Sequence, residues 1–92
     1  MDVYSQIAEK IIERQETIIG PVAIEQAKQV PGISVDWPAH QVLISGDKAH
    51  AIDELVNVYE GFFGRISVEV SKDAAHSFLQ QLPLENLPRS LR

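Results

Sequence analysis

Two stretches of the chain, residues 7–28 and 51–72, match each other at a constant separation of 44 positions. Identical residues fall at four places in this alignment: Glu16/Glu60, Gly20/Gly64, Glu25/Glu69 and Lys28/Lys72. Apolar residues coincide at six more: Ile11/Leu55, Ile12/Val56, Ile18/Phe62, Ile19/Phe63, Val22/Ile66 and Ile24/Val68. A shared glycine with matching apolar positions on both sides predicts two related helical arms that arose by internal duplication.

The first arm is expected to consist of two helices. Apolar residues in the range 2–19 recur every three or four positions, which is the spacing of an amphipathic helix. Gly20-Pro21 ends this pattern because proline lacks a backbone donor, yet proline is well suited to the first turn of a new helix. A second helix is therefore expected over residues 21–29, and Pro31-Gly32 stops it.

A β-hairpin is expected next, over about residues 33–45. The segments 33–36 and 41–45 are rich in β-branched and apolar residues, and they flank the connection Trp37-Pro38-Ala39-His40. Asp47 then offers a side chain that can cap the N-terminus of a helix starting near residue 48.

The second arm is expected to be helical over residues 48–82, with a bend near Gly61 or Gly64. Residues 65–71 alternate between apolar and polar, which by itself favours a strand. Their counterpart in the first arm opens on a proline at a helix start, and the three-four apolar spacing continues to residue 82, so a helix is favoured over the strand. Residues 83–92 contain two prolines and no periodicity, and an extended tail is expected there.

The predicted architecture is therefore a mainly helical α+β fold: one domain over residues 1–82, with two helical arms and a hairpin between them. A chain of 92 residues buries only a modest core. Its net charge of −5 without any basic cluster argues against nucleic acid as a partner. No signal-peptide pattern and no apolar run of about 18 residues is present, so no membrane contact and a cytoplasmic location are expected.

Few residues offer reactive chemistry. The absence of cysteine rules out disulfides, thiolate metal sites and a thiol nucleophile. The three histidines, His40, His50 and His76, are not predicted to converge, and Asp47 beside His50 is better explained as a helix cap. Ser45 lacks the pattern of a nucleophile elbow, and the glycines form no phosphate-binding loop. No catalytic residue, metal site or cofactor is expected.

One rival interpretation is a sensor or enzyme that binds a small molecule or metal in a pocket between the helical arms. Glu25 and Glu69 occupy equivalent repeat positions and can be drawn facing each other across a pseudo-twofold axis, as paired acid and base or metal-binding carboxylates do. A histidine would complete such a site. Solvent-exposed helix faces explain the two glutamates equally well.

The leading hypothesis is a non-enzymatic protein–protein interaction module, a small acidic dimerisation or adaptor domain. Trp37 lies at the predicted hairpin tip, where it either anchors an interface or folds back onto the helices. Tyr59, Phe62 and Phe63 form an aromatic patch on the long helix. Wide apolar helix faces and open hairpin edges in a small chain favour a twofold homodimer. Trp37, Tyr59, Phe62 and Phe63 are the predicted partner-binding residues.

Overall fold

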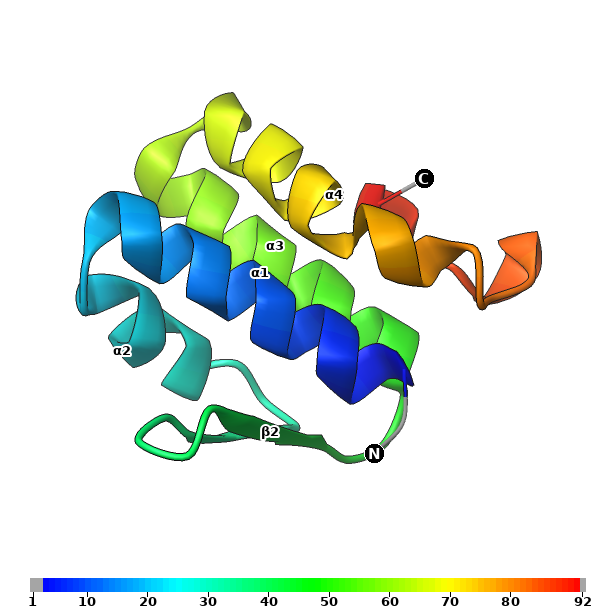
Figure 1. Ribbon diagram of the computed structural model, residues 1–92, viewed down its shortest axis with the longest axis horizontal. Helices are drawn as coiled ribbons and strands as arrows, with labels where there is room; N and C mark the ends of the chain where they lie inside the picture. Colours follow the sequence, from blue (N-terminus) through cyan, green and yellow to red (C-terminus); the bar gives the residue numbers. More distant parts are fainter. Residues whose placement is uncertain (1–2, 92) are drawn as a thin grey trace.

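The computed structural model describes residues 3–91, apart from the side chain of Leu84, and shows four helices with one small hairpin (Figure 1). The helices are α1 (Val3–Ile19), α2 (Val22–Lys28), α3 (Lys48–Phe63) and α4 (Arg65–Leu79). The strands are β1 (Ile33–Asp36) and β2 (Gln41–Ile44), and two short 3-10 helices, η1 (Leu84–Asn86) and η2 (Arg89–Leu91), follow α4. The predicted mainly helical α+β class is confirmed. Residue 2, where the first helix was expected to begin, lies outside the described residues.

Each arm consists of two helices joined at a glycine. α1 and α3 run in the same direction, and α2 and α4 return from the same end of the molecule (Figure 1). Gly20 and Gly64 have φ angles of 82° and 81°, a left-handed conformation that favours glycine. In each case the glycine N–H donates to a glutamate carbonyl four residues earlier, Glu16 or Glu60, at 2.8 Å. We call residues 18–22 and 62–66 the two corners.

The two arms are joined by a pair of equivalent hydrogen bonds. The Gln15 side-chain amide on α1 donates to the Ser67 carbonyl on α4 at 3.0 Å. The Tyr59 hydroxyl on α3 donates to the Ala23 carbonyl on α2 at 2.8 Å. Gln15 and Tyr59 are 44 positions apart, and so are Ala23 and Ser67. Both donors are buried, so each bond satisfies a polar group that water cannot reach.

The core lies where α1 crosses the second arm and the hairpin. α1 packs closely along α4, where small side chains such as Ser67, Ser71 and Ala75 are buried. Small residues at such a contact let two helix axes approach each other. Larger side chains fill the remaining space; the most deeply buried are Ile7, Ile11, Ile12, Val42, Ile52, Leu55, Val56 and Tyr59. Most of them come from α1 and α3, so these two helices supply the centre of the fold.

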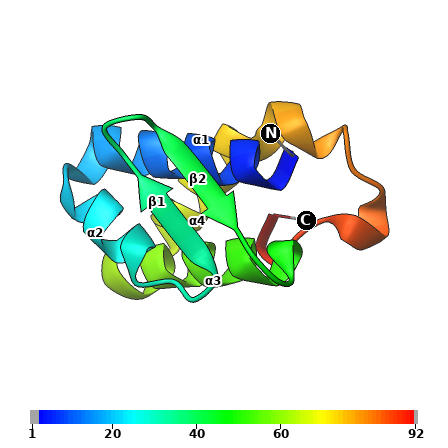
Figure 2. The ribbon, with the colours of Figure 1, turned by 90° about the horizontal axis from the view of Figure 1, so that it is seen from below.

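The hairpin covers one side of the helices as a separate layer (Figure 2). β1 and β2 are antiparallel, with Ile33 opposite Ile44 and Val35 opposite Val42. These four side chains are buried or partly buried, whereas Leu43 on the other face is exposed, as the alternation of a half-buried strand requires. β2 packs on α1 and β1 on α2.

The second arm and the tail differ in detail from the sequence-based expectation. The chain turns at Gly64, so the expected helix 48–82 is divided into α3 and α4, and α4 ends at Leu79. Residues 65–71 are helical. The tail is not extended over its described part: it forms η1 and η2 and packs against α3 and α4. Burial of Pro88 and Leu91 offsets the entropy lost when this segment is ordered.

Candidate functional site

The histidines do not form a reactive cluster. His40 lies in the hairpin connection, His50 in the first turn of α3 and His76 near the end of α4, and all three are exposed. The Asp47 carboxylate accepts a hydrogen bond from the His50 backbone N–H at 3.1 Å, which is the geometry of a helix N-cap. Within residues 3–91 no group of three or more histidine, aspartate and glutamate side chains is placed to hold a metal ion.

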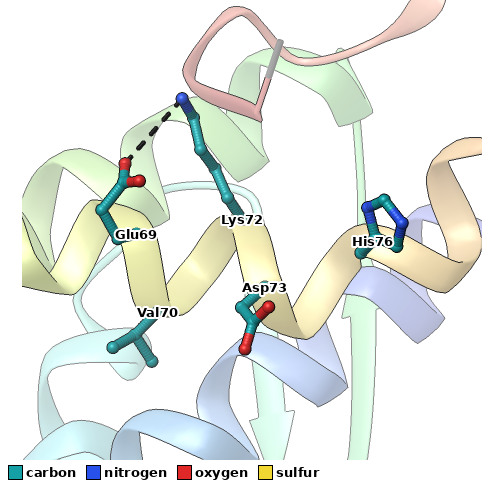
Figure 3. A pocket seen from close by; sticks show the side chains of 5 residues that line it. All are labelled: Glu69, Val70, Lys72, Asp73 and His76. Atoms are coloured by element: carbon teal, nitrogen blue, oxygen red, sulfur yellow. Dashed lines mark ion pairs between the residues drawn. The ribbon is translucent and has the colours of Figure 1, made fainter.

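A shallow depression on α4 is lined by charged side chains (Figure 3). Its lining residues are Glu69, Val70, Lys72, Asp73 and His76. Lys72 reaches toward Glu69 at 3.9 Å, while Asp73 and His76 point in different directions. All five residues belong to one helix and the depression is open to solvent, so nothing encloses a small molecule there.

The two glutamates of the rival hypothesis lie on exposed helix surfaces. Glu25 is 4.0 Å from Lys28 on α2, and Glu69 is 3.9 Å from Lys72 on α4. Their side chains are 70% and 58% exposed, a setting in which such ion pairs contribute little to stability. Buried side chains including Ile11, Leu55 and Tyr59 pack where the arms meet.

Trp37 folds back onto α1 instead of projecting from the hairpin. It is only 7% exposed, and its indole N–H donates to the Glu16 carboxylate at 3.1 Å. The His40 ring stacks on it with ring centroids 4.3 Å apart, and the His40 imidazole lies 3.8 Å from the Glu13 carboxylate. Of the two expected positions for Trp37, the structure shows the buried one, in which Glu16 accepts the indole N–H and His40 covers the ring.

The three aromatic residues of α3 have different surroundings. Tyr59 is fully buried, and burial raises the pKa of its hydroxyl well above the ordinary value. Phe63 is partly buried against the core, and its ring centroid lies 6.0 Å from that of Phe62. Phe62 itself is 63% exposed. Of the predicted partner-binding residues, only Phe62 and part of Phe63 therefore offer surface to another molecule.

The exposed apolar residues gather at the two corners. Five large hydrophobic side chains of the described chain are strongly exposed, and four of them are Ile18, Val22, Phe62 and Ile66. The two corners lie at the same end of the molecule in both views (Figures 1 and 2). We call these four side chains the corner patch. Ile18 and Phe62 are 44 positions apart, as are Val22 and Ile66, so each arm contributes one residue before its glycine and one after it.

The sequence alignment pairs these residues, but of the four only Phe62 was predicted to contact a partner. The alignment of the two arms matches Ile18 with Phe62 and Val22 with Ile66, which was the available signal. Their exposure follows from the chain direction, since each corner turns at a left-handed glycine and leaves these residues outside the core.

Charge is balanced around the corner patch and unbalanced elsewhere. The segments 14–28 and 58–72 together carry four acidic and four basic side chains, so the remainder of the chain holds the whole net charge of −5. A surface of this kind can approach another acidic molecule without the repulsion that other faces exert.

Comparisons of the chain with protein-family models, curated proteins and solved structures found no match. None of the helices within residues 3–91 has the length and apolar character needed to cross a membrane.

Proposed function

We propose that this protein is a non-enzymatic interaction module that forms a homodimer through the corner patch. The observation that carries the proposal is the collection of Ile18, Val22, Phe62 and Ile66 at one end of the molecule, each 39–70% exposed. Exposed apolar side chains that gather in one place are typical of interaction sites, whereas single ones are ordinary. Phe62 is the central anchor, with Phe63 beside it.

The strength of the association follows from the apolar surface that the patch can bury. Covering each partly exposed side chain is worth roughly 1 to 2 kcal/mol, or roughly 8 to 16 kcal/mol for the eight in two copies. Lost translational and rotational freedom opposes this with about 4 to 15 kcal/mol. Because these two ranges overlap, the net gain is small, and we expect a weak dimer with a dissociation constant between about 10 µM and 1 mM.

Charge indicates which face of two copies can meet with the least repulsion. The net charge of −5 makes two copies repel each other, and the charge-balanced corners offer the approach with the least repulsion.

The internal duplication is part of the same proposal. Three observations support it: the two left-handed glycines, the equivalent hydrogen bonds of Gln15 and Tyr59, and the similar burial of most matched residues. In this account the two arms descend from one helix–glycine–helix unit. Duplication placed two copies of its exposed apolar pair at one end of the chain.

Trp37 and Tyr59 have a different role in this account from the one first expected. Both are buried, so they stabilise the arms that present the patch and do not contact the partner. An adaptor role, in which the dimer binds a further protein, and a cytoplasmic location complete the proposal. The lack of cysteine supports that location.

Light scattering of the purified chain between about 10 µM and 1 mM tests the proposal. We expect the apparent mass to rise from monomer toward dimer over this range, and Phe62→Ser to remain monomeric. Leu43→Ser is the matched control, because Leu43 is 72% exposed but lies on the hairpin. A monomeric wild-type chain at 1 mM, or a dimer that Leu43→Ser abolishes and Phe62→Ser leaves intact, would reject the proposal.

A further inference from the structure

The C-terminal segment is placed in the fold like a docked peptide. After α4 the chain leaves the helices over residues 80–87 and returns to set η2 beside α3 and α4 (Figures 1 and 2). Tyr4 near the start of α1 donates to the Asn86 carbonyl at 2.9 Å on this excursion. Residues 88–91 are thus carried to their position by a loop and do not continue the helix before them.

One carboxylate holds this segment. Asp53 on α3 accepts hydrogen bonds from the Ser90 hydroxyl at 2.6 Å, the Ser90 backbone N–H at 2.9 Å and the Arg89 backbone N–H at 3.3 Å. Two of the three donors are main-chain groups, so the carboxylate recognises the local shape of a short segment. The hydroxyl adds a requirement for a small side chain that can donate a proton.

Apolar contacts flank these hydrogen bonds. Pro88 and Leu91 are buried, with Leu91 only 3% exposed, and the Leu91 backbone N–H donates to the Pro88 carbonyl at 3.0 Å. η2 contacts both α3 and α4. The segment therefore presents a proline and a leucine inward on either side of a serine that pairs with Asp53.

The groove that receives the segment extends further than the segment does. A depression of about 270 Å³ continues from Ser90 along α3 and α4. Besides Ser90 and Arg89 it is lined by Val56, Asn57, Glu60, Arg65, Val68 and Lys72. Its lining is mainly polar and charged, with Val56 and Val68 as the apolar members, so it suits a polar or charged continuation of a bound peptide.

From these contacts we propose that the α3–α4 groove around Asp53 is a binding site for peptide segments of the form Pro-x-Ser-Leu, occupied in this fold by residues 88–91. The ligand class is a short peptide with a serine for Asp53, a proline two residues before it and a leucine directly after it. A longer peptide would continue into the open depression. The contacts with Asp53 do not involve the corner patch, so this part of the site does not depend on the proposed dimer.

Residues 88–91 occupy the groove in preference to a free peptide because they are covalently attached to the chain. A short connection gives the segment an effective concentration on the order of millimolar or above, and a free peptide must exceed this to displace it. A trans peptide therefore binds well only when the attached segment is weakened. Leu91→Ala weakens the segment and leaves every residue of the groove unchanged.

The test measures binding of a fluorescein-labelled, C-terminally amidated peptide of residues 85–91 to the full-length chain by fluorescence anisotropy. We expect at least about tenfold tighter binding to Leu91→Ala than to the wild-type chain. Adding Asp53→Asn to the Leu91→Ala chain should abolish that gain. A peptide whose serine is replaced by alanine should bind the Leu91→Ala chain about tenfold more weakly.

A second variant keeps the test valid if the Leu91→Ala chain does not fold. Ser90→Ala removes one hydrogen bond to Asp53 and keeps Leu91 in place, so it should give a smaller gain in peptide affinity with an unchanged circular dichroism spectrum. Equal binding to all variants, or no binding to either the Leu91→Ala or the Ser90→Ala chain, overturns the proposal. The dimer measurements are unaffected by either outcome, since none of these substitutions touches a corner.

Discussion

Gln15 and Tyr59 stand at equivalent positions of the two arms, and each side chain donates to the backbone of the opposite arm. The Gln15 amide reaches the Ser67 carbonyl and the Tyr59 hydroxyl reaches the Ala23 carbonyl, at 3.0 and 2.8 Å. An amide and a phenol thus make the same connection in a buried setting. The relative position of the arms, and with it the position of the corners, depends on these two bonds.

Tyr59→Phe removes one of the two bonds without removing the ring. At pH 7 we expect a loss of about 1 to 2 kcal/mol in the free energy of unfolding, measured by urea denaturation. Tyr4→Phe is the control, because its hydroxyl bonds to Asn86 at an exposed position and its removal should cost less. Equal losses in both variants would contradict a special role for the buried bond.

The raised pKa of Tyr59 also predicts that the free energy of unfolding depends on pH in the alkaline range. Burial raises the pKa of Tyr59 in the folded chain above the unfolded value of about 10. The contribution of the Tyr59 hydroxyl to stability is therefore complete below pH 10. It declines above pH 10, because the unfolded chain loses the Tyr59 proton while the folded chain keeps it. The stability difference between wild type and Tyr59→Phe should therefore shrink between pH 9 and pH 11.5. A constant difference across this range would show that the hydroxyl is not buried.

Gln15→Leu tests the other bond. The substitution removes the donor to the Ser67 carbonyl and to the Ser71 hydroxyl, which lies 3.3 Å away. We expect a loss of about 1 to 3 kcal/mol in the free energy of unfolding, because a buried carbonyl loses its partner. Gln29→Leu, at an exposed position after α2, should change stability by less than about 0.5 kcal/mol.

The left-handed glycines at the two corners predict that replacing either one by alanine lowers stability by a similar amount. Gly20→Ala and Gly64→Ala should each destabilise the chain by about 1 to 2 kcal/mol, since an added Cβ meets no neighbouring atom and only the left-handed backbone resists it. Gly61→Ala, within α3, should instead stabilise by about 0.5 to 1 kcal/mol. Thermal melts of the three variants measure this; destabilisation by Gly61→Ala would refute the helical geometry before the second corner.

The Trp37–Glu16 hydrogen bond can be followed through the only tryptophan of the chain. Glu16→Ala should raise acrylamide quenching of Trp37 emission and lower stability by about 1 kcal/mol. Glu60→Ala is the matched control on the other arm, where no tryptophan is bonded, and it should leave the emission unchanged. Strong quenching in the wild-type chain would contradict the buried position of Trp37.

Local patterns predicted the helices, the hairpin and the corners because those depend on short-range rules. The three-four apolar spacing, the helix-start proline and the glycine shared by both arms are all visible in the sequence. The partners of Trp37 and Asp53 were not predictable. Their hydrogen bonds join residues 21 and 37 positions apart, and no local rule connects a hairpin or a tail to one face of a helix.

Only part of the corner patch was predicted, because burial at a corner also depends on contacts that local patterns do not show. Apolar periodicity shows which residues can be buried, but the turn of the chain at each corner determines which of them stay outside the core. Phe62 was predicted to contact a partner, whereas Ile18 was counted only in the apolar spacing of the first helix. The exposure of the matched pairs could not be predicted from the sequence, because it depends on both arms turning at the same end of the molecule.

A dilution series of ¹H–¹⁵N spectra from about 1 mM to 10 µM tests the central claim most directly. If the corners form the interface of a homodimer, amide resonances of Ile18, Val22, Phe62 and Ile66 will shift with one common midpoint, and those of Leu43 will stay constant. Shifts confined to the hairpin, or no shifts anywhere over the whole range, would contradict the account.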